Sequence, residues 1–315
     1  MKLWGIDLGG TKIECAVLTE DMNVIVRKRI ATEANKGYHH ILWQILKLVN
    51  EVVDEIGERP ERIGFATPGV LEPETQTMKN CNTVCMNGRP MKDDLQDILD
   101  VPVKLANDAN CFALAETLMG AGKEYPDTKV VFGVIMGTGV GGGLVVNKEN
   151  IEGRQGLGGE WGHNVLEENG ADCYCGKKGC VERVISGPAL EEFYFSKSGQ
   201  RLNLSEILQL HMAGTDEHAT ATIERLLENY GRAISMLVNI IDPNLIIIGG
   251  GVGNIDLLYT EGYERIKKYV FNNGRLTTPI CKPVLGDSAG VYGAALLWQN
   301  KFELSPGMIN QNSQK

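Results

Sequence analysis

The sequence predicts an α/β protein of two lobes, and three observations carry this prediction. The chain has 315 residues, more than one typical domain contains. Apolar runs of strand length alternate with stretches of helical periodicity along most of the chain. A unit of strand, glycine turn and strand opens the chain and returns at residues 130–146, as if two lobes shared one plan. Hydrophobic residues make up 43% of the chain, enough for a substantial core.

The N-terminal part of the chain is predicted to be rich in strands. Apolar residues at helical spacing indicate a long helix at 38–56, and a second helix opens at Asn107 to Asn110 and runs to about Met119. Residues 70–92 have no strong period and are expected to form a long loop, a feature that is often functional in compact domains. Five strands are expected here, at residues 3–6, 13–18, 24–30, 63–66 and 103–105.

The C-terminal part carries most of the predicted helices. Strands are expected at residues 130–136, 144–146 and 245–248. Residues 153–182 lie between them and are rich in glycine, cysteine and histidine. Helices are expected at about 188–197, 204–212, 217–241, 256–271 and 288–300.

Composition and charge argue against several classes of protein. The net charge of -9 and the lack of a stripe dense in lysine and arginine argue against nucleic acid as a partner. No apolar run approaches the ~18 residues of a membrane span, and the first ten residues lack the features of a signal peptide. We therefore expect a cytoplasmic protein, whose cysteines bind metal or pack in the core rather than form disulfides.

Three glycine clusters each follow an apolar strand. Glycines at strand ends let backbone N–H groups approach phosphate oxygens, because no Cβ stands in the way. One cluster is weak support, since tight turns need glycine anyway, but three in one chain favour nucleotide binding. No Walker-type motif is present, so the metal ion that accompanies the phosphates must be held by a carboxylate such as Asp7. Aspartate is also a common turn former, which is the alternative explanation of Asp7. The predicted nucleotide-binding residues are Asp7, Gly9, Gly10, Thr11, Lys12, Gly137, Thr138, Gly139, Gly249, Gly250 and Gly251.

The second cluster, Gly137-x-Gly139-x-x-Gly142, also matches the dinucleotide-binding fingerprint. That fingerprint requires a helix after the glycines, whereas Leu144 to Val146 has the character of a strand. We therefore interpret the match as coincidental.

One histidine and three cysteines lie close together in the glycine-rich segment. Thiolates and an imidazole form a tetrahedral ligand set that suits zinc. Four protein ligands leave no open position for water, so the predicted zinc is structural. The other cysteines are scattered and are expected to pack as small apolar residues, although Cys81 and Cys85 have a spacing that metal sites also use. The predicted metal ligands are His163, Cys173, Cys175 and Cys180.

Asp108 is the predicted catalytic base. A hydroxyl group that attacks phosphorus needs a carboxylate to accept its proton, and Asp108 follows a strand between Asn107 and Asn110. A plain helix N-cap would explain one polar residue at this place but not the whole cluster. A polyol is recognised by paired acceptors and amides. The candidates for this role are Asn82, Asn107, Glu160, His163 and Glu182.

Together these motifs resemble those of the ROK family of bacterial sugar kinases and repressors. The resemblance runs in order from residue 1 to about residue 300, and the cysteine loop is its most specific part. The motifs that carry it are Asp7–Lys12, Asn107–Asn110, Gly159–His163, Cys173–Glu182 and Gly249–Gly251.

The resemblance implies two actin-like (ribonuclease H-like) ATPase lobes, with the active site in the cleft between them. The small lobe is expected at 1–117 with a C-terminal helix at about 288–302, and the large lobe at 118–287 with a zinc loop at 163–180. The family's base corresponds to Asp108, which is also expected to contact the sugar, and its zinc ligands to the four residues named above. Its other sugar-binding positions correspond to Gly69, Asn82, Asn107, Glu160, His163 and Glu182.

Within the family, the chain is most similar to bacterial fructokinases that also accept mannose, since Lys79 to Gly88 resembles their sugar loop. Cys85 and Met86 depart from that loop, and N-acetylglucosamine kinases are nearly as similar around Asn107 to Leu114. We expect transfer of the γ-phosphate of ATP to the 6-hydroxyl of a hexose. Fructose is the first choice, and N-acetylglucosamine, glucose and mannose are the alternatives.

A sugar-sensing repressor is the rival class. Members of that class carry a helix-turn-helix domain before the kinase-like part, and Asp7 lies too near the start of this sequence to leave room for one. A non-catalytic, zinc-stabilised sugar-binding protein is a further alternative, against which the presence of Asp108 argues. The expected cofactors are ATP, Mg²⁺ and structural Zn²⁺; the expected partners are the hexose, ATP and a second copy of the chain, without nucleic acid or membrane.

Overall fold

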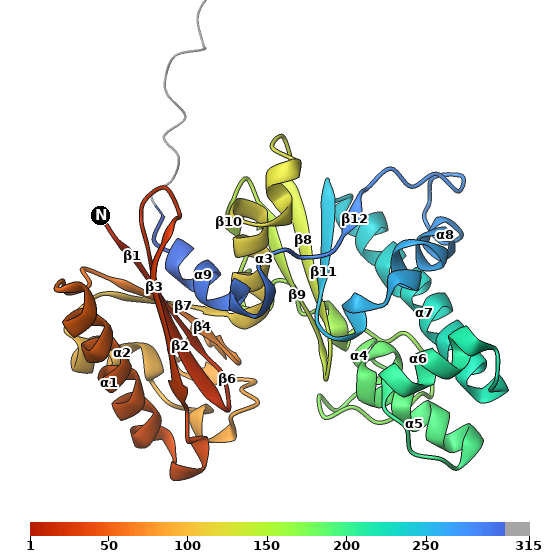
Figure 1. Cartoon of the computed structure of the whole chain (residues 1–315), viewed down its shortest axis with the longest axis horizontal. Coiled ribbons are helices and arrows are strands. Elements are labelled where there is room, and N and C mark those ends of the chain that lie inside the picture. Colours follow the sequence, from red (N-terminus) through yellow and green to blue (C-terminus); the bar gives the residue numbers. More distant parts are fainter. Residues whose placement is uncertain (300–315) are drawn as a thin grey trace, which may run out of the picture.

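The computed structural model describes residues 1–299 and contains two five-stranded sheets, with helices between them and on both outer sides (Figure 1). The first sheet has the order β3-β2-β1-β4-β7 and the second β10-β9-β8-β11-β12. In each sheet three antiparallel strands continue into two parallel ones, so the second sheet repeats the plan of the first, as the sequence predicted. The strands are β1 (Leu3–Leu8), β2 (Lys12–Leu18), β3 (Val24–Ala31), β4 (Ile63–Thr67), β7 (Val103–Asn107), β8 (Val130–Met136), β9 (Val140–Val146), β10 (Glu149–Asn150), β11 (Leu245–Gly249) and β12 (Ile280–Cys281).

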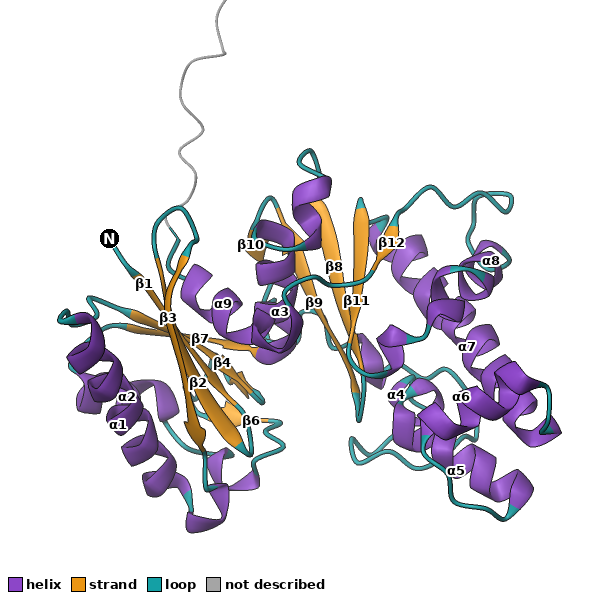
Figure 2. Cartoon of the chain, in the orientation of Figure 1, coloured by secondary structure: helices purple, strands orange, loops and turns teal. Residues whose placement is uncertain are grey.

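Two helices, α3 (Asp108–Leu118) and α9 (Ala289–Leu296), fill the layer between the sheets (Figure 2). α9 packs on β1 and β4, α3 packs on β8 and β9, and the two helices pack on each other. A Cβ atom at Gly64 would lie 1.9 Å from the carbonyl oxygen of Ala294, and one at Gly293 would lie 1.8 Å from that of Cys111. Part of the chain's glycine therefore serves close helix packing and not only turns.

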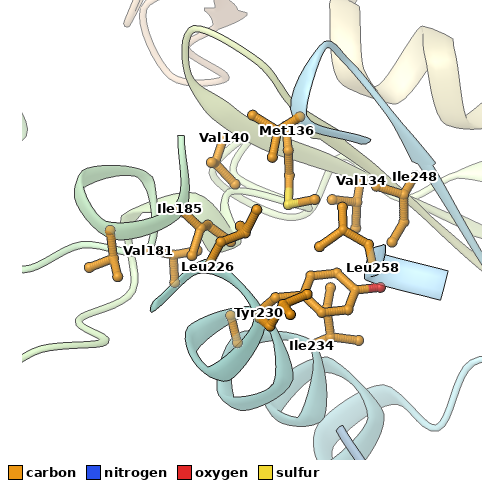
Figure 3. Packing of buried hydrophobic residues seen from close by; sticks show 14 of the residues in the cluster. Val134, Met136, Val140, Val181, Ile185, Leu226, Tyr230, Ile234, Ile248 and Leu258 are labelled. Atoms are coloured by element: carbon orange, nitrogen blue, oxygen red, sulfur yellow. The ribbon is translucent and has the colours of Figure 1, made fainter. Parts of the chain in front are cut away.

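The outer helices cover the remaining face of each sheet. α1 (Tyr38–Ile56) and α2 (Met91–Leu99) pack on the first sheet, and α7 (Glu217–Ile241) lies behind the second (Figure 1). Tyr230 and Ile234 of α7 pack against Met136 of β8 and Ile248 of β11 (Figure 3). Val140, the first residue after the second glycine turn, belongs to the same buried cluster. The turn thus rests on a rigid core.

Four shorter helices complete the outer layer of the second sheet. α7 begins where the Asp216 side chain accepts hydrogen bonds from the backbone N–H groups of His218 and Ala219. No helix among the described residues is long and apolar enough to cross a membrane. The shorter helices are α4 (Glu182–Ile185), α5 (Gly187–Ser198), α6 (Leu204–Ala213) and α8 (Glu261–Lys267).

Four predicted elements differ from the structure, and one of them is the strand expected at 144–146, which begins at Val140 as β9. The expected loop at 70–92 contains the short hairpin of β5 (Val70–Leu71) and β6 (Met78–Lys79), and its end starts α2. The helix expected at 256–271 is split, because the backbone of Thr260 leaves the helical region between a 3-10 turn and α8. The C-terminal helix expected at about 288–302 corresponds to α9, and residues 300–302 lie outside the described residues.

The proposed boundary between lobes at residues 117 and 118 stays a prediction. It assigns α3 to the small lobe, and α3 packs both on α9 and on β8 and β9 of the second sheet. α3 and α9 thus form the connection between the two sheets rather than the edge of one lobe.

Candidate active site

Two carboxylates lie at the same edge of the first sheet. β1, β4 and β7 are parallel, so Asp7 near the end of β1 and Asp108 directly after β7 lie at the carboxyl ends of their strands. Burial raises the pKa of Asp7 to about 7, and the neighbouring Asp108 adds to this rise. Burial also raises the pKa of Asp108 to about 6, with a smaller contribution from Glu160. Solvent reaches the Asp108 side chain, but the protein around it removes much of its hydration.

The N-cap of α3 is Asn107 and not Asp108. Asn107 Oδ1 accepts a hydrogen bond of 2.9 Å from the backbone N–H of Ala109. Asp108 Oδ1 accepts from the same N–H at 2.7 Å, which lowers its pKa and partly opposes burial. Asp108 is therefore the first helical residue, and the N-cap role does not account for it.

Three further polar residues approach this pair from the second half of the chain. Glu160 directly precedes the short 3-10 helix Trp161–His163, His163 is the last residue of that helix, and Glu182 begins α4. Burial raises the pKa of Glu160, while His163 lowers it and Glu182 raises it. Because Glu160 also acts on Asp108, these side chains form one continuous group of interacting charges.

Gly69 and Asn82 lie together on the first lobe. A Cβ atom at Gly69 would lie 2.5 Å from both Cys81 Sγ and the carbonyl oxygen of Lys79, so only glycine fits. The backbone N–H of Asn82 donates to the carbonyl oxygen of Pro68 at 3.4 Å. Asn82 itself is exposed to solvent.

The second and third glycine turns lie side by side. A Cβ at Gly137 would be 3.7 Å from the backbone nitrogen of Gly251, and Gly250 has a φ of 84°. The N–H of Gly137 donates to the carbonyl oxygen of Gly139 at 2.9 Å, and β9 follows at once, which confirms that the dinucleotide fingerprint is coincidental. Thr138 is exposed between these glycines, and Gly249 ends β11.

The first glycine turn joins β1 to β2 in the first lobe. The N–H of Gly9 donates to the carbonyl oxygen of Lys12 at 2.9 Å, and Thr11 and Gly10 are exposed between them. A Cβ at Gly10 would lie 3.3 Å from Thr83 Oγ1, so this turn adjoins the expected sugar loop.

The four predicted metal ligands lie together. The ligand atoms of His163, Cys173, Cys175 and Cys180 all lie within 4.8 Å of one another. His163 Nδ1 is 3.6 Å from Cys173 Sγ, and the Sγ atoms of Cys175 and Cys180 are also 3.6 Å apart. This donor set and its compactness fit one tetrahedral zinc ion. Cys81 and Cys85 belong to no such group among the described residues.

The Tyr174 hydroxyl lies within hydrogen-bond distance of the second ring nitrogen of His163. His163 Nε2 and the Tyr174 hydroxyl are 3.0 Å apart. A contact between His163 and a sugar therefore needs Tyr174 to share that nitrogen or to move.

Two site residues were missed by the sequence reasoning. The N–H of Gly187 at the start of α5 donates to the carbonyl oxygen of Gly137 at 2.9 Å, which fixes the second turn. A Cβ at Gly290 of α9 would lie 2.7 Å from Asp7 Oδ2. Both glycines lie at ordinary helix starts in the sequence, so nothing but the tertiary contact distinguishes them.

Comparison with known proteins shows the family to which the chain belongs. The family model described as "ROK family" matches residues 3–301. An N-acetyl-D-glucosamine kinase of Pectobacterium atrosepticum is 34% identical over 304 residues, covering 93% of this chain and 98% of that protein. The crystal structure of a ROK hexokinase from Thermus thermophilus has a TM-score of 0.84 and 31% identity over 94% of this chain and 97% of that one. A ROK family glucokinase from Streptomyces griseus, solved with glucose and AMPPNP, has a TM-score of 0.76 and 26% identity, covering 94% and 99%.

The fold is therefore the two-lobed, actin-like ATPase fold of sugar kinases, as the sequence predicted. The chain belongs to the ROK family and is a sugar kinase, which transfers a phosphoryl group from ATP. The more specific expectation of fructose as substrate finds no support in these relatives.

Proposed function

We propose that this kinase phosphorylates the 6-hydroxyl of N-acetylglucosamine. Relatives that carry this activity in their name are 34% and 36% identical to the chain along 93% of its length. The observation that carries the chemistry is the pairing of Asp108 with Asp7 at one sheet edge, in surroundings that raise the pKa of both. Fructose remains the second candidate, favoured by the resemblance of Lys79 to Gly88 to a fructokinase sugar loop.

Asp108 is the proposed general base. Its carboxylate accepts the proton of the sugar hydroxyl while the hydroxyl oxygen bonds to the γ-phosphorus and the bond from that phosphorus to its bridging oxygen breaks, releasing ADP. A pKa of about 6 leaves Asp108 ionised at neutral pH and a stronger base than an ordinary aspartate. The sugar is held by the proposed contacts of Asn82, Asn107, Glu160, His163 and Glu182, beside Gly69.

The glycine turns and Asp7 are proposed to hold the nucleotide. Backbone N–H groups of the three turns at Gly9–Lys12, Gly137–Gly139 and Gly249–Gly251 would face the phosphates, except those of Gly9 and Gly137, which donate within their own turns. Asp7, next to the first turn, is the carboxylate placed to hold Mg²⁺, which neutralises phosphate charge when bound. The repulsion between Asp7 and Asp108 is of the kind that a bound cation relieves.

The proposed zinc is structural and orders the sugar-binding side chains. Its four ligands include His163, three residues after Glu160, and Cys180, two residues before Glu182. Val181 between the latter two is fully buried in the core (Figure 3). One ion would thus fix both segments that carry the glutamates.

We also propose that the protein forms a homodimer, which analytical ultracentrifugation would test.

A coupled ADP-release assay over a panel of hexoses tests the proposed function. We expect the highest kcat/KM with N-acetylglucosamine and lower values with glucose, mannose and fructose. A clear preference for fructose would instead support the sugar-loop resemblance. Binding of a hexose without any turnover would contradict the kinase and support a sugar sensor.

A further inference from the structure

A buried carboxylate lies in the layer between the two sheets, near the far end of the helix that begins with Asp108. Glu116, in the last turn of α3, is 0% exposed. Its Oε2 atom accepts a hydrogen bond of 3.0 Å from the backbone N–H of Ala121, and its Oε1 atom accepts one of 2.8 Å from that of Leu285. The backbone nitrogen of Val284 lies 3.1 Å from both oxygens. Neither the proposed sugar site nor the proposed nucleotide site uses this carboxylate.

The three N–H groups belong to the two segments by which the chain crosses between the sheets (Figure 1). The first crossing, residues 119–129, leads from α3 to β8 of the second sheet. The second crossing, residues 282–288, leads from β12 of the second sheet to α9, which packs on β1 and β4 of the first. Glu116 therefore joins both crossings at one point.

The choice of a carboxylate at this position is specific. Burying a charge costs free energy, and a negative charge near the C-terminal end of a helix also opposes the helix dipole. A carboxylate, however, accepts on both oxygens and donates on neither, so it can serve all three N–H groups. A glutamine has one such oxygen and could serve only one crossing fully. A Cβ atom at Gly120 would lie 2.0 Å from Glu116 Oε2, so this glycine leaves the space that the carboxylate occupies.

We propose that Glu116 is a positioning residue for phosphoryl transfer, which holds the two lobes in the relative arrangement that the reaction requires. α3 begins with Asp108, the proposed base, and the first crossing leads to β8, which ends at the second glycine turn. The second crossing leads to Gly290, which lies against Asp7. This inference rests on the proposed function, because the base and the phosphate-binding turn are the groups that Glu116 would align.

The kinetics of Glu116→Gln test the proposal. The reacting hydroxyl oxygen and phosphorus must approach within about 3–3.5 Å, and a remote change that misplaces them by about 1 Å can cost about 10²-fold. We expect kcat to fall by about 10–100-fold. KM for ATP and for N-acetylglucosamine should stay within about threefold, because no proposed substrate contact is removed. Glu124→Gln is the matched control, since Glu124 is an exposed residue of the first crossing, and it should leave kcat unchanged.

Gly120→Ala is a second variant, which disturbs the same contact without removing the charge. Its methyl group would occupy the place of Glu116 Oε2, so we expect a similar fall in kcat. Because both changes act on one contact, the double variant should be little slower than the slower single variant. Fully additive losses would overturn the proposal. The folded fraction of each variant is measured by circular dichroism, and a fall in kcat that only matches a loss of folded protein would overturn it as well.

Hydrogen exchange of the substrate-free protein tests the contact itself and needs no sugar. We expect the backbone amides of both crossings to exchange faster in Glu116→Gln than in the unaltered protein. If another hexose is phosphorylated in place of N-acetylglucosamine, the proposed substrate is wrong, and the same kinetic comparison with that hexose decides the role of Glu116. Faster exchange in only one crossing, or a near-normal kcat in Glu116→Gln, would overturn the proposal.

Discussion

The Glu182 carboxylate accepts a hydrogen bond of 3.0 Å from the backbone N–H of Val140. A Cβ at Gly139 would lie 2.6 Å from the same Glu182 oxygen, so the second glycine turn and this side chain are in direct contact. Glu182 is a proposed sugar ligand, and the turn is proposed to hold phosphate. One residue therefore connects the two substrate sites.

Exchanging Glu182 separates these roles. Glu182→Gln keeps an oxygen that can accept from Val140 N–H, whereas Glu182→Ala leaves that N–H without its partner. We expect both variants to raise KM for the sugar, but only Glu182→Ala to raise KM for ATP, by about tenfold. Steady-state kinetics with each substrate varied in turn would measure this. Equal KM values for ATP in the two variants would show that the hydrogen bond does not position the turn.

Removing a zinc ligand should lower stability as well as activity. Because zinc binding is coupled to folding, Cys175→Ser should lose bound zinc and melt at a lower temperature than the unaltered protein. Cys85→Ser is the matched control, since Cys85 lies outside the ligand group, and it should keep about one zinc per chain. Metal analysis together with calorimetry would check both. A zinc-free protein of unchanged stability would contradict a structural zinc.

The pH dependence of kcat/KM should report the ionisation of Asp7 and Asp108. Asp108 must be ionised to accept a proton, so kcat/KM for the sugar should fall as the pH drops through about 6. Because Asp7 and Asp108 interact, the fall in kcat/KM on the acid side of the profile reflects the titration of both carboxylates and not of Asp108 alone. A higher Mg²⁺ concentration should move that fall to lower pH, because a cation at Asp7 favours ionised carboxylates. A flat profile between about pH 5 and pH 8 would rule out this base.

Neutralising Asp7 should stabilise the substrate-free protein at alkaline pH. The pKa of Asp7 rises from 3.8 to about 7 on folding, so the folded state binds the proton more tightly than the unfolded state. The folded protein therefore loses stability as the pH rises through this window, and the loss is complete above it. Asp7→Asn should raise Tm at about pH 8 and leave it nearly unchanged at about pH 4. The exposed Asp21→Asn is the control, and a lower Tm for Asp7→Asn at about pH 8 would refute the argument.

The longer strands and the long helices were predictable because each carries its own periodic signal, whereas the two-residue strands β5, β6, β10 and β12 are too short to carry one. α1 and α7 have the predicted bounds, since an apolar stripe of many turns is unambiguous. α2 escaped prediction because it presents only Met91, Leu95 and Leu99 to the core, and so short a pattern does not stand out within a long loop.

The site was predictable where chemistry and spacing coincide. The cysteine loop and the polar cluster around Asp108 can both be recognised from the sequence alone. The four ligand atoms predicted from the cysteine loop lie close together in the structure. The contact of Glu182 with Val140 and the place of Gly290 against Asp7 join segments far apart in the chain. No local pattern contains such contacts, because they depend on how α4 and α9 pack in three dimensions.

The most direct test of the whole account is the kinetics of Asp108→Asn. Asparagine keeps the size and most hydrogen bonds of the side chain but cannot accept the proton, so kcat should fall by about 10²–10⁴-fold while sugar affinity changes much less. Asn107→Ala is the control and should weaken sugar binding more than it slows the reaction. If Asp108→Asn kept a near-normal kcat, Asp108 would not be the base, and Glu160 would be the next candidate. A collapse of sugar affinity with kcat preserved at saturation would equally contradict the account, because Asp108 would then only position the ligand.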